Sequence, residues 1–253
     1  MTSLETRGLT IRFGGHVAVD SVSCTFRPGE LTTIVGPNGA GKTTYFNLIS
    51  GQLPASAGAV LLDGRDITRE GAPARTRAGI GRAFQLTNLF PRLSVAENVR
   101  LAVQSAAGVH YDMLRPWMRH DELIARADAV LERVALASRR DVAAAALSHG
   151  DQRKLEVALM IALEPKIFMF DEPTAGMSVD EVPVVLDLIA ALKQDTSKII
   201  LLVEHKMDVV RSLADRIIVL HNGKLVADGA PAEVIASPVV QEAYLGSFGE
   251  KAA

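Results

Sequence analysis

The feature that most constrains this chain is the glycine-rich segment at residues 36–43, Gly-Pro-Asn-Gly-Ala-Gly-Lys-Thr. It satisfies the pattern G-x-x-x-x-G-K-[ST] and lies between a predicted buried strand, Leu31–Val35, and a helix-forming stretch at 44–50. Glycines let backbone N–H groups turn inward at a helix N-terminus, Lys42 reaches the β- and γ-phosphates, and Thr43 offers a hydroxyl to Mg²⁺. A glycine-rich turn with a solvated lysine would not account for both flanking elements. The segment predicts a phosphate-binding loop.

Two adjacent acids, Asp171 and Glu172, directly follow an apolar run at residues 167–170. An aspartate there could hold the Mg²⁺ shell, and a glutamate beside it could polarise an attacking water. Taken alone, such a pair could equally be solvated surface charge. The phosphate-binding loop upstream favours the catalytic interpretation.

Turn signals and apolar periodicity predict an α/β chain. Asp63-Gly64 and Asn222-Gly223 are typical of type I′ hairpins, and residues 198–203 read as another buried strand. Capping boxes begin helices at Ser94 and at Ser148, and residues 121–136 carry a helical apolar stripe. We therefore expect a mixed or parallel sheet core, interrupted by a helical segment.

Charge and cysteine content narrow the function classes. The chain has 27 Lys and Arg against 29 Asp and Glu, a net charge of −2, so we expect no nucleic-acid partner. Its single cysteine, Cys24, cannot form an internal disulfide, and its polar start does not resemble a signal peptide. The apolar runs are too short to cross a bilayer. These observations predict a cytoplasmic protein.

Taken together, the motifs resemble those of the nucleotide-binding subunits of ABC transporters, from residue 4 to about 248. Leu-Ser-His-Gly-Asp at 147–151 is similar to that family's signature motif LSGGQ. Gln85 stands in the position of its Q-loop, and His205 in that of its switch histidine. Phe13 resembles the aromatic residue that stacks on adenine.

Single residues within this resemblance also have ordinary interpretations. Ser148 could simply begin a helix, His205 could be structural, and an isolated Gln85 or Phe13 is more often a loop or core residue. The chain also departs from the family pattern at three positions. His149 replaces the first signature glycine, Asp151 replaces the terminal glutamine, and Ser178 replaces the usual D-loop aspartate.

The resemblance implies one ABC ATPase domain over residues 1–253. A P-loop NTPase core with an N-terminal antiparallel β subdomain would take about 1–84 and 164–253, and a helical subdomain would take about 85–163. It implies ATP binding by Phe13, Gly36, Pro37, Asn38, Gly39, Ala40, Gly41, Lys42, Thr43 and Thr44. It implies Mg²⁺ ligation by Thr43, Gln85 and Asp171, and catalysis by Lys42, Gln85, Glu172 and His205. The signature Ser148, His149, Gly150 and Asp151 would act on a partner cassette's ATP.

Within the family, the chain is most similar to the first of the paired ATPases of branched-chain amino acid importers. The similarity rests on Phe13-Gly14-Gly15, the segments 171–178 and 204–205, an insert at about 106–122 and the ending 237–246. It implies import of branched-chain amino acids, or of related amides or organic acids. It also implies a second ABC ATPase, the same or different, two membrane permeases, a secreted solute-binding protein and a position on the inner face of the membrane.

Other functions remain as alternatives. An exporter or lipid-extraction ATPase shares the core motifs but should lack the long insert and this ending. A soluble ABC ATPase usually carries two cassettes or a coiled-coil insertion, and a generic P-loop kinase would not need the signature at Ser148. The insert around Trp117 could form a satellite core or a docking surface for a membrane subunit.

Overall fold

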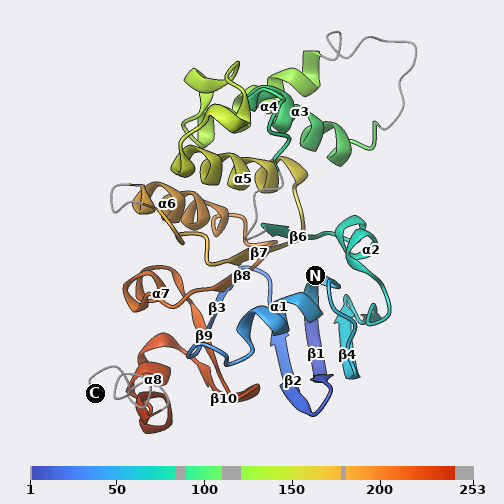
Figure 1. Cartoon of the computed structure of the whole chain (residues 1–253), viewed down its shortest axis with the longest axis vertical. Helices are drawn as coiled ribbons and strands as arrows, with labels where there is room; N and C mark the ends of the chain where they lie inside the picture. The colour runs from blue at the N-terminus through green and yellow to red at the C-terminus, as the bar shows by residue number, and fades with distance from the viewer. Residues whose placement is uncertain (1, 84–88, 110–120, 178–180, 243–253) are drawn as a thin grey trace. The chain divides into compact units, whose positions relative to one another are not determined.

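A computed structural model describes residues 2–83, 89–109, 121–177 and 181–242 (Figure 1). The chain divides into two compact units. The first comprises residues 1–82, 166–172 and 192–253, and the second comprises 83–165 and 173–191. The expected α/β fold class is confirmed, because an antiparallel sheet, a mostly parallel sheet and helices are all present. The subdomain boundaries given above stay a prediction.

The first unit contains two sheets. A four-stranded antiparallel sheet has the order β2-β1-β4-β5, formed by β1 (Leu4–Phe13), β2 (His16–Phe26), β4 (Ala57–Leu62) and β5 (Arg65–Asp66). A six-stranded sheet has the order β10-β9-β3-β8-β7-β6. Its strands are β3 (Leu31–Val35), β6 (Ile80–Ala83), β7 (Ile167–Asp171), β8 (Ile199–Val203), β9 (Arg216–His221) and β10 (Lys224–Gly229).

Local chemistry explains how these strands turn and pair. Both residues of Asp63-Gly64 and of Asn222-Gly223 have positive φ, as type I′ hairpins require, so both predicted turns are confirmed. β3 pairs in parallel with β8 and β9, and β7 pairs in parallel with β8. All residues of β3, β7 and β8 are buried, and β8 and the first four residues of β7 are continuous apolar runs, as is typical of strands covered on both faces.

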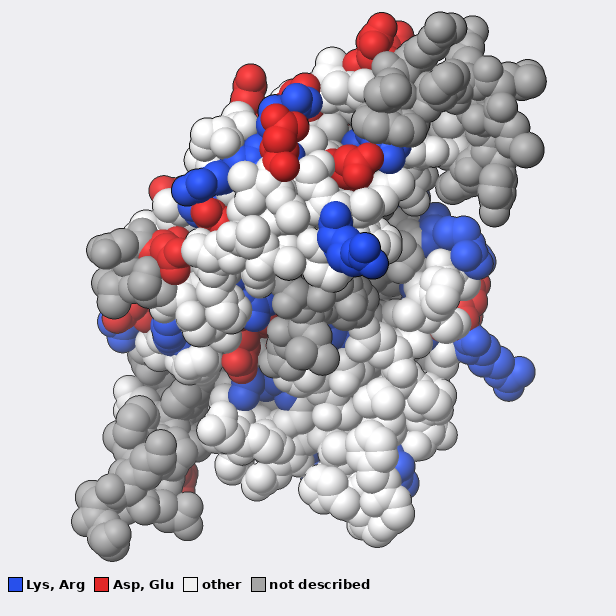
Figure 2. Space-filling view, turned by 45° about the horizontal axis from the view of Figure 1, so that its top comes forward, with Lys and Arg blue, Asp and Glu red and all other residues white. Residues whose placement is uncertain are grey.

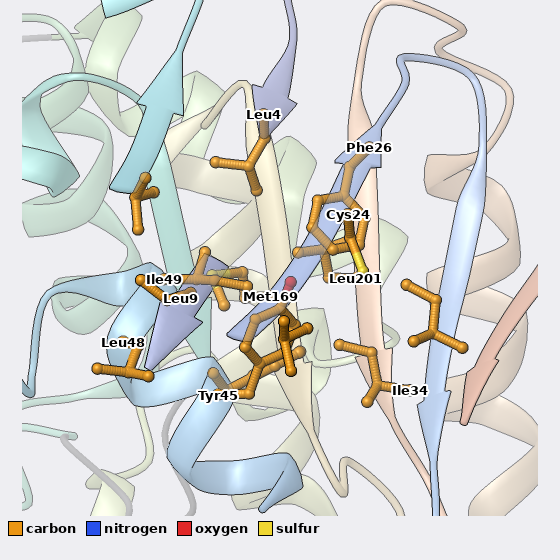
Figure 3. Packing of buried hydrophobic residues seen from close by; sticks show 14 of the residues in the cluster. Leu4, Leu9, Cys24, Phe26, Ile34, Tyr45, Leu48, Ile49, Met169 and Leu201 are labelled. Carbon is orange, nitrogen blue, oxygen red and sulfur yellow. The ribbon is translucent and has the colours of Figure 1, made fainter. Parts of the chain in front are cut away.

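Helices and a shared apolar core complete the first unit. The helices are α1 (Lys42–Ser50), α2 (Ala72–Arg77), α7 (Met207–Leu213) and α8 (Pro231–Ala236). Figure 3 shows Tyr45 and Ile49 of α1 in one cluster with Leu9 of β1 and with Met169 and Leu201 of the parallel sheet. This cluster fixes α1, and with it the loop that precedes the helix.

The second unit is helical. It contains α3 (Val95–Ala106), α4 (Asp121–Arg133), α5 (His149–Leu163), most of α6 (Val182–Leu192) and the short 3-10 turns Ala137–Arg139 and Ala144–Ala146. The hydroxyls of Ser94 and Ser148 accept the backbone N–H groups of Glu97 and Asp151, each at 3.1 Å. Both predicted N-caps are therefore confirmed.

Some boundaries differ from expectation. β1 spans Leu4–Phe13, and bulged pairing with β2 and β4 carries the strand through the polar residues near its start. α1 begins at Lys42, two residues earlier than the apolar pattern indicated, since the loop itself leads into the first turn. Ser178 and the insert around Trp117 lie outside the described residues.

Candidate nucleotide-binding site

Three parallel strands end at one edge of the six-stranded sheet, and a predicted site residue follows or ends each. β3 ends at Val35 before the glycine loop, β7 ends at Asp171, and β8 ends two residues before His205. In the strand register, Val203 pairs with Ile34 on one side and with Asp171 on the other. Ligands of α/β sheets bind outside the carboxyl ends of parallel strands. The register thus brings the predicted loop, acids and histidine of this unit to one edge.

The loop can approach its neighbours only because it lacks side chains at two positions. A Cβ atom on Gly36, at φ 150°, would lie 2.1 Å from the carbonyl oxygen of Leu220. At Gly41, at φ 95°, it would lie 2.4 Å from that of Ala18. Gly41 is also the N-cap of α1 and provides no side-chain cap. Within this described segment, the first N–H groups of α1 are therefore available to an anion.

Lys42 is held over this loop. Its side chain is largely buried, and its Nζ donates to the carbonyl oxygens of Gly36 at 2.7 Å and Pro37 at 2.9 Å. Burial lowers the pKa of Lys42, and the nearby charges of Glu172 and Asp171 oppose that shift. A phosphate oxygen would compensate the buried ammonium better than these neutral carbonyls do.

Asp171 has one engaged and one open oxygen. Its side chain is fully buried, and Oδ2 accepts a hydrogen bond from Arg82 Nη2 at 2.8 Å. Oδ1 is buried and has no hydrogen-bond partner among the described residues. Burial raises the pKa of Asp171, whereas Arg82 and, more weakly, the Thr43 hydroxyl lower it.

An open carboxylate oxygen beside a threonine hydroxyl suits Mg²⁺, which prefers hard oxygen ligands. Within the described residues, no cluster of three or more His, Cys, Asp and Glu side chains could hold a metal ion alone. Gln85, the third predicted ligand, lies outside the described residues.

Glu172 and His205 lie side by side. His205 Nδ1 is 3.8 Å from Glu172 Oε1 and 3.7 Å from Glu204 Oε2. Glu204 is fully buried, and its Oε2 accepts the backbone N–H groups of His205 at 2.8 Å and Lys206 at 3.2 Å. The carboxylate of Glu204 thus orients the start of the segment that carries His205.

The signature segment, in the second unit, begins α5. Ser148 and His149 are exposed, whereas Gly150 is buried, and a Cβ on Gly150 would overlap the carboxylate of Glu181. Asp151 Oδ1 accepts from Lys154 Nζ at 2.9 Å, so the departure from glutamine brings an ion pair with it. The exposed helix start can bind an acceptor from another molecule.

Three further residues complete the comparison with expectation. Phe13 ends β1 and is 51% exposed, so its ring is accessible. The sequence did not identify Arg82 as a site residue, because one arginine in the short strand Ile80–Ala83 carries no recognisable signal. Only the position of β6 beside β7 in the sheet brings it near Asp171. Ser178 lies outside the described residues.

Comparison with known proteins decides the family. The ABC transporter family model matches residues 19–175, more than half of the sequence. The chain belongs to the ABC transporter family. A second model, described as branched-chain amino acid ATP-binding cassette transporter, matches residues 224–249 of the cassette.

Relatives support this over nearly the full length of the cassette. It is 39% identical over 250 residues to the high-affinity branched-chain amino acid transport ATP-binding protein LivG of Escherichia coli K12, covering 96% of this chain and 97% of LivG. The crystal structure of the ATP-binding cassette MJ1267 in its ADP conformation superposes with a TM-score of 0.82 at 29% identity, covering 97% and 99% of the two chains. A dimeric, post-hydrolysis structure of MJ0796 with ADP and Pi gives 0.76 at 25% identity, covering 90% and 98%.

The cassette is thus an ATP-binding ATPase. Among its described residues, no helix combines the length and the apolar character needed to cross a bilayer. On the face shown in Figure 2, basic and acidic side chains lie among one another, and wide areas carry neither.

Proposed function

We propose that this cassette hydrolyses ATP to power the import of branched-chain amino acids, or of related amides or organic acids, through separate membrane subunits. One observation carries the proposal: residues 224–249 match the family model of branched-chain amino acid cassettes. The identity to LivG supports it. Cassettes of many transport systems share the phosphate loop, so the C-terminal match is what favours this solute class.

ATP would bind with its phosphates in the loop 36–44 and its adenine against Phe13. The N–H groups of the loop and Lys42 Nζ would donate to phosphate oxygens. Lys42 would then replace its hydrogen bonds to the carbonyl oxygens of Gly36 and Pro37 with bonds to negatively charged phosphate oxygens. The exposed ring of Phe13 offers an apolar face to the base.

Mg²⁺ would be held by Thr43 and by the open Oδ1 of Asp171, with Gln85 as the third ligand. When bound, the cation neutralises charge that develops on the phosphates. Asp171 is positioned for this by its place at the end of β7.

Glu172 would accept a proton from the water that attacks the γ-phosphorus, while the bond from that phosphorus to ADP breaks. His205, beside Glu172, would contact the γ-phosphate. General-base catalysis of this kind contributes about 10²- to 10⁴-fold. Lys42 would stabilise negative charge on the transferred group.

A second ABC ATPase, identical or related, would complete the site. The start of α5, at Ser148, His149, Gly150 and Asp151, would face the ATP of the partner cassette, with Ser148 and His149 exposed. The dimeric state described for MJ0796 supports such an arrangement. Two membrane permeases and a secreted solute-binding protein would complete the transporter, with the cassette on the cytoplasmic face of the membrane.

Co-purification tests the proposal. The tagged chain is expressed with the membrane subunits and binding protein encoded beside it, and the binding protein is screened by thermal shift against leucine, isoleucine, valine, amides and organic acids. We expect the membrane subunits to co-purify and the binding protein to be stabilised by one of these solutes. An unrelated preferred solute, or assembly without any import permease, would contradict the proposal.

A further inference from the structure

Arg82, at the third position of β6, joins the edge of the parallel sheet to the helix after the phosphate loop. Its Nη2 donates to Asp171 Oδ2 at 2.8 Å. Its Nη1 donates to Asn47 Oδ1 at 2.6 Å and to Ser50 Oγ at 2.9 Å. Asn47 and Ser50 lie on α1, whose first residue is Lys42. The arginine therefore connects the carboxylate at the end of β7 to the helix that carries the loop.

The guanidinium is held in one orientation. Its side chain is 8% exposed, and its Cζ lies 5.6 Å from the centroid of the Phe46 ring, also on α1. A planar guanidinium donates toward Asp171 with one nitrogen and toward Asn47 with the other in a fixed geometry, whereas the three donors of a lysine ammonium all leave from one freely rotating nitrogen.

This contact divides the Asp171 carboxylate into two unlike oxygens. Buried side-chain oxygens in native proteins nearly always have partners, and a purely structural ion pair would be expected to satisfy both. Here Arg82 occupies Oδ2, whereas Oδ1 is buried without a hydrogen-bond partner among the described residues. This oxygen, on a carboxyl group that also interacts with the Thr43 hydroxyl, is therefore available to a ligand.

We propose that Arg82 is a positioning residue that sets the affinity of the nucleotide site for its divalent cation. By engaging Oδ2 it leaves Oδ1 for the cation and its bound water. By its bonds to α1 it fixes that oxygen relative to the Thr43 hydroxyl on the same helix. The inference rests on the proposed binding of ATP with a divalent cation at this site.

The experiment separates cation affinity from nucleotide affinity. A fluorescent ATP analogue is titrated onto full-length wild type, Arg82→Gln and Arg82→Lys, first in EDTA and then at a fixed analogue concentration with increasing Mg²⁺. Partners that orient metal ligands typically contribute 10- to 100-fold to metal affinity. For Arg82→Gln we expect at least a tenfold rise in the Mg²⁺ concentration that produces half of the Mg²⁺-dependent change in analogue binding. The affinity for the analogue in EDTA should change by less than about twofold. The Mg²⁺ requirement of Arg82→Lys should lie between those of the wild type and Arg82→Gln.

Arg216→Gln is the matched control. Arg216 makes a two-bond ion pair with Asp228, at 2.6 Å for each bond, between β9 and β10 of the same unit. Its hydrogen-bond partners among the described residues are Thr25, Glu30 and Asp228, which do not include Asp171 or any residue of α1. Its loss should leave the Mg²⁺ requirement unchanged.

Several outcomes would overturn the inference. A folded Arg82→Gln protein with the wild-type Mg²⁺ requirement would do so, as would equal weakening of binding in EDTA and in Mg²⁺. If the glutamine variant does not fold, the lysine variant decides, because it keeps a positive charge beside Asp171; an unshifted requirement there also overturns the inference. Failure of the wild type itself to bind the analogue would instead count against the proposed nucleotide site.

Discussion

The imidazole Nδ1 of His205 lies 3.8 Å from Oε1 of Glu172, at the ends of two strands that pair in parallel. The separation exceeds a hydrogen bond, and the side chains are 52% and 28% exposed, so both can turn toward a nucleotide. Glu172 has a φ of 49°, and its N–H donates to Val203 O at 3.0 Å. The backbone pairing of β7 and β8 therefore sets the distance between the proposed base and the proposed phosphate contact.

The first prediction concerns Glu172. Glu172→Gln keeps the size of the side chain but removes the proton acceptor, so phosphate release should fall at least 100-fold while ATP binding stays within about twofold. Phosphate release and calorimetric binding are measured on the same preparations. Glu164→Gln, which alters an exposed acid paired with Arg126, is the control and should keep full turnover. Normal turnover in Glu172→Gln would remove Glu172 from catalysis.

The second prediction concerns Lys42. Lys42→Ala removes a charged donor to the phosphates, a contact worth about 1.5 to 3 kcal/mol, so ATP affinity should fall roughly 10- to 100-fold. The measurement is isothermal calorimetry with ATP and Mg²⁺. Lys166→Ala is the matched control, since Lys166 precedes β7 at the opposite end of the strand from Asp171 and pairs with Asp63. Undiminished affinity in Lys42→Ala would refute the assignment of the loop.

The third prediction is a pH dependence of stability. Burial raises the pKa of the Cys24 thiol from 9.0 to about 11, with a smaller opposing effect from the Tyr45 hydroxyl. The folded state favours the neutral thiol. Its contribution to the free energy of unfolding is therefore fully present below the unfolded pKa of 9.0 and is lost as the pH rises toward the folded pKa of about 11. Between pH 8 and pH 10, the wild type should lose about 1.4 kcal/mol of unfolding free energy through this group.

Urea unfolding of wild type and Cys24→Ala at pH 8 and pH 10 measures this loss. Other groups titrate in both proteins, so the quantity compared is the difference between their two pH-dependent losses. Parallel losses in wild type and variant would show that the folded thiol ionises as readily as the unfolded one.

The fourth prediction concerns Asp151 in the proposed dimer. In that arrangement Asp151 lies in the first turn of a helix that faces a triphosphate, and at roughly 8 Å with an effective dielectric near 20 the repulsion is about 2 kcal/mol before screening. Lys154 Nζ, 2.9 Å from Asp151 Oδ1, offsets part of it. Asp151→Gln should therefore tighten ATP-driven association by less than about tenfold.

Association is followed by titrating ATP against dimer formation in a Glu172→Gln background, at low and high salt. The gain should shrink as salt screens the charges. Weaker association in the Asp151→Gln protein, or a gain independent of salt, would assign Asp151 a direct ligand role or a simple capping role.

Much of the fold followed from local chemistry in the sequence. The turns at Asp63 and Asn222 were predictable because type I′ geometry needs positive φ at both central residues, and asparagine, aspartate and glycine tolerate it best. The caps at Ser94 and Ser148 were predictable because a serine hydroxyl satisfies an N–H group that the helix leaves open. Each signal lies within four residues of its effect.

Features that depend on distant parts of the chain were not predictable. Arg82 contacts Asp171 across 89 residues of sequence, and nothing in the short strand that carries it indicates that partner. The buried Glu204 was noted only as part of a family resemblance, and its role became visible through its bonds to the backbone of His205 and Lys206. The boundaries of β1 depended on bulges and partner strands rather than on its own polar residues.

Solute-stimulated ATP hydrolysis tests the central claim most directly. The chain is reconstituted in liposomes with its co-purified membrane subunits, its second ATPase where that differs, and the solute-binding protein, and phosphate release is measured with and without leucine, isoleucine or valine. A complex carrying Glu172→Gln is the inactive control. We predict that the loaded binding protein stimulates hydrolysis and that labelled solute accumulates in the compartment facing the cassettes. A rate of phosphate release that is the same with and without these solutes, or solute movement in the opposite direction, would contradict the assignment as an import ATPase for branched-chain amino acids.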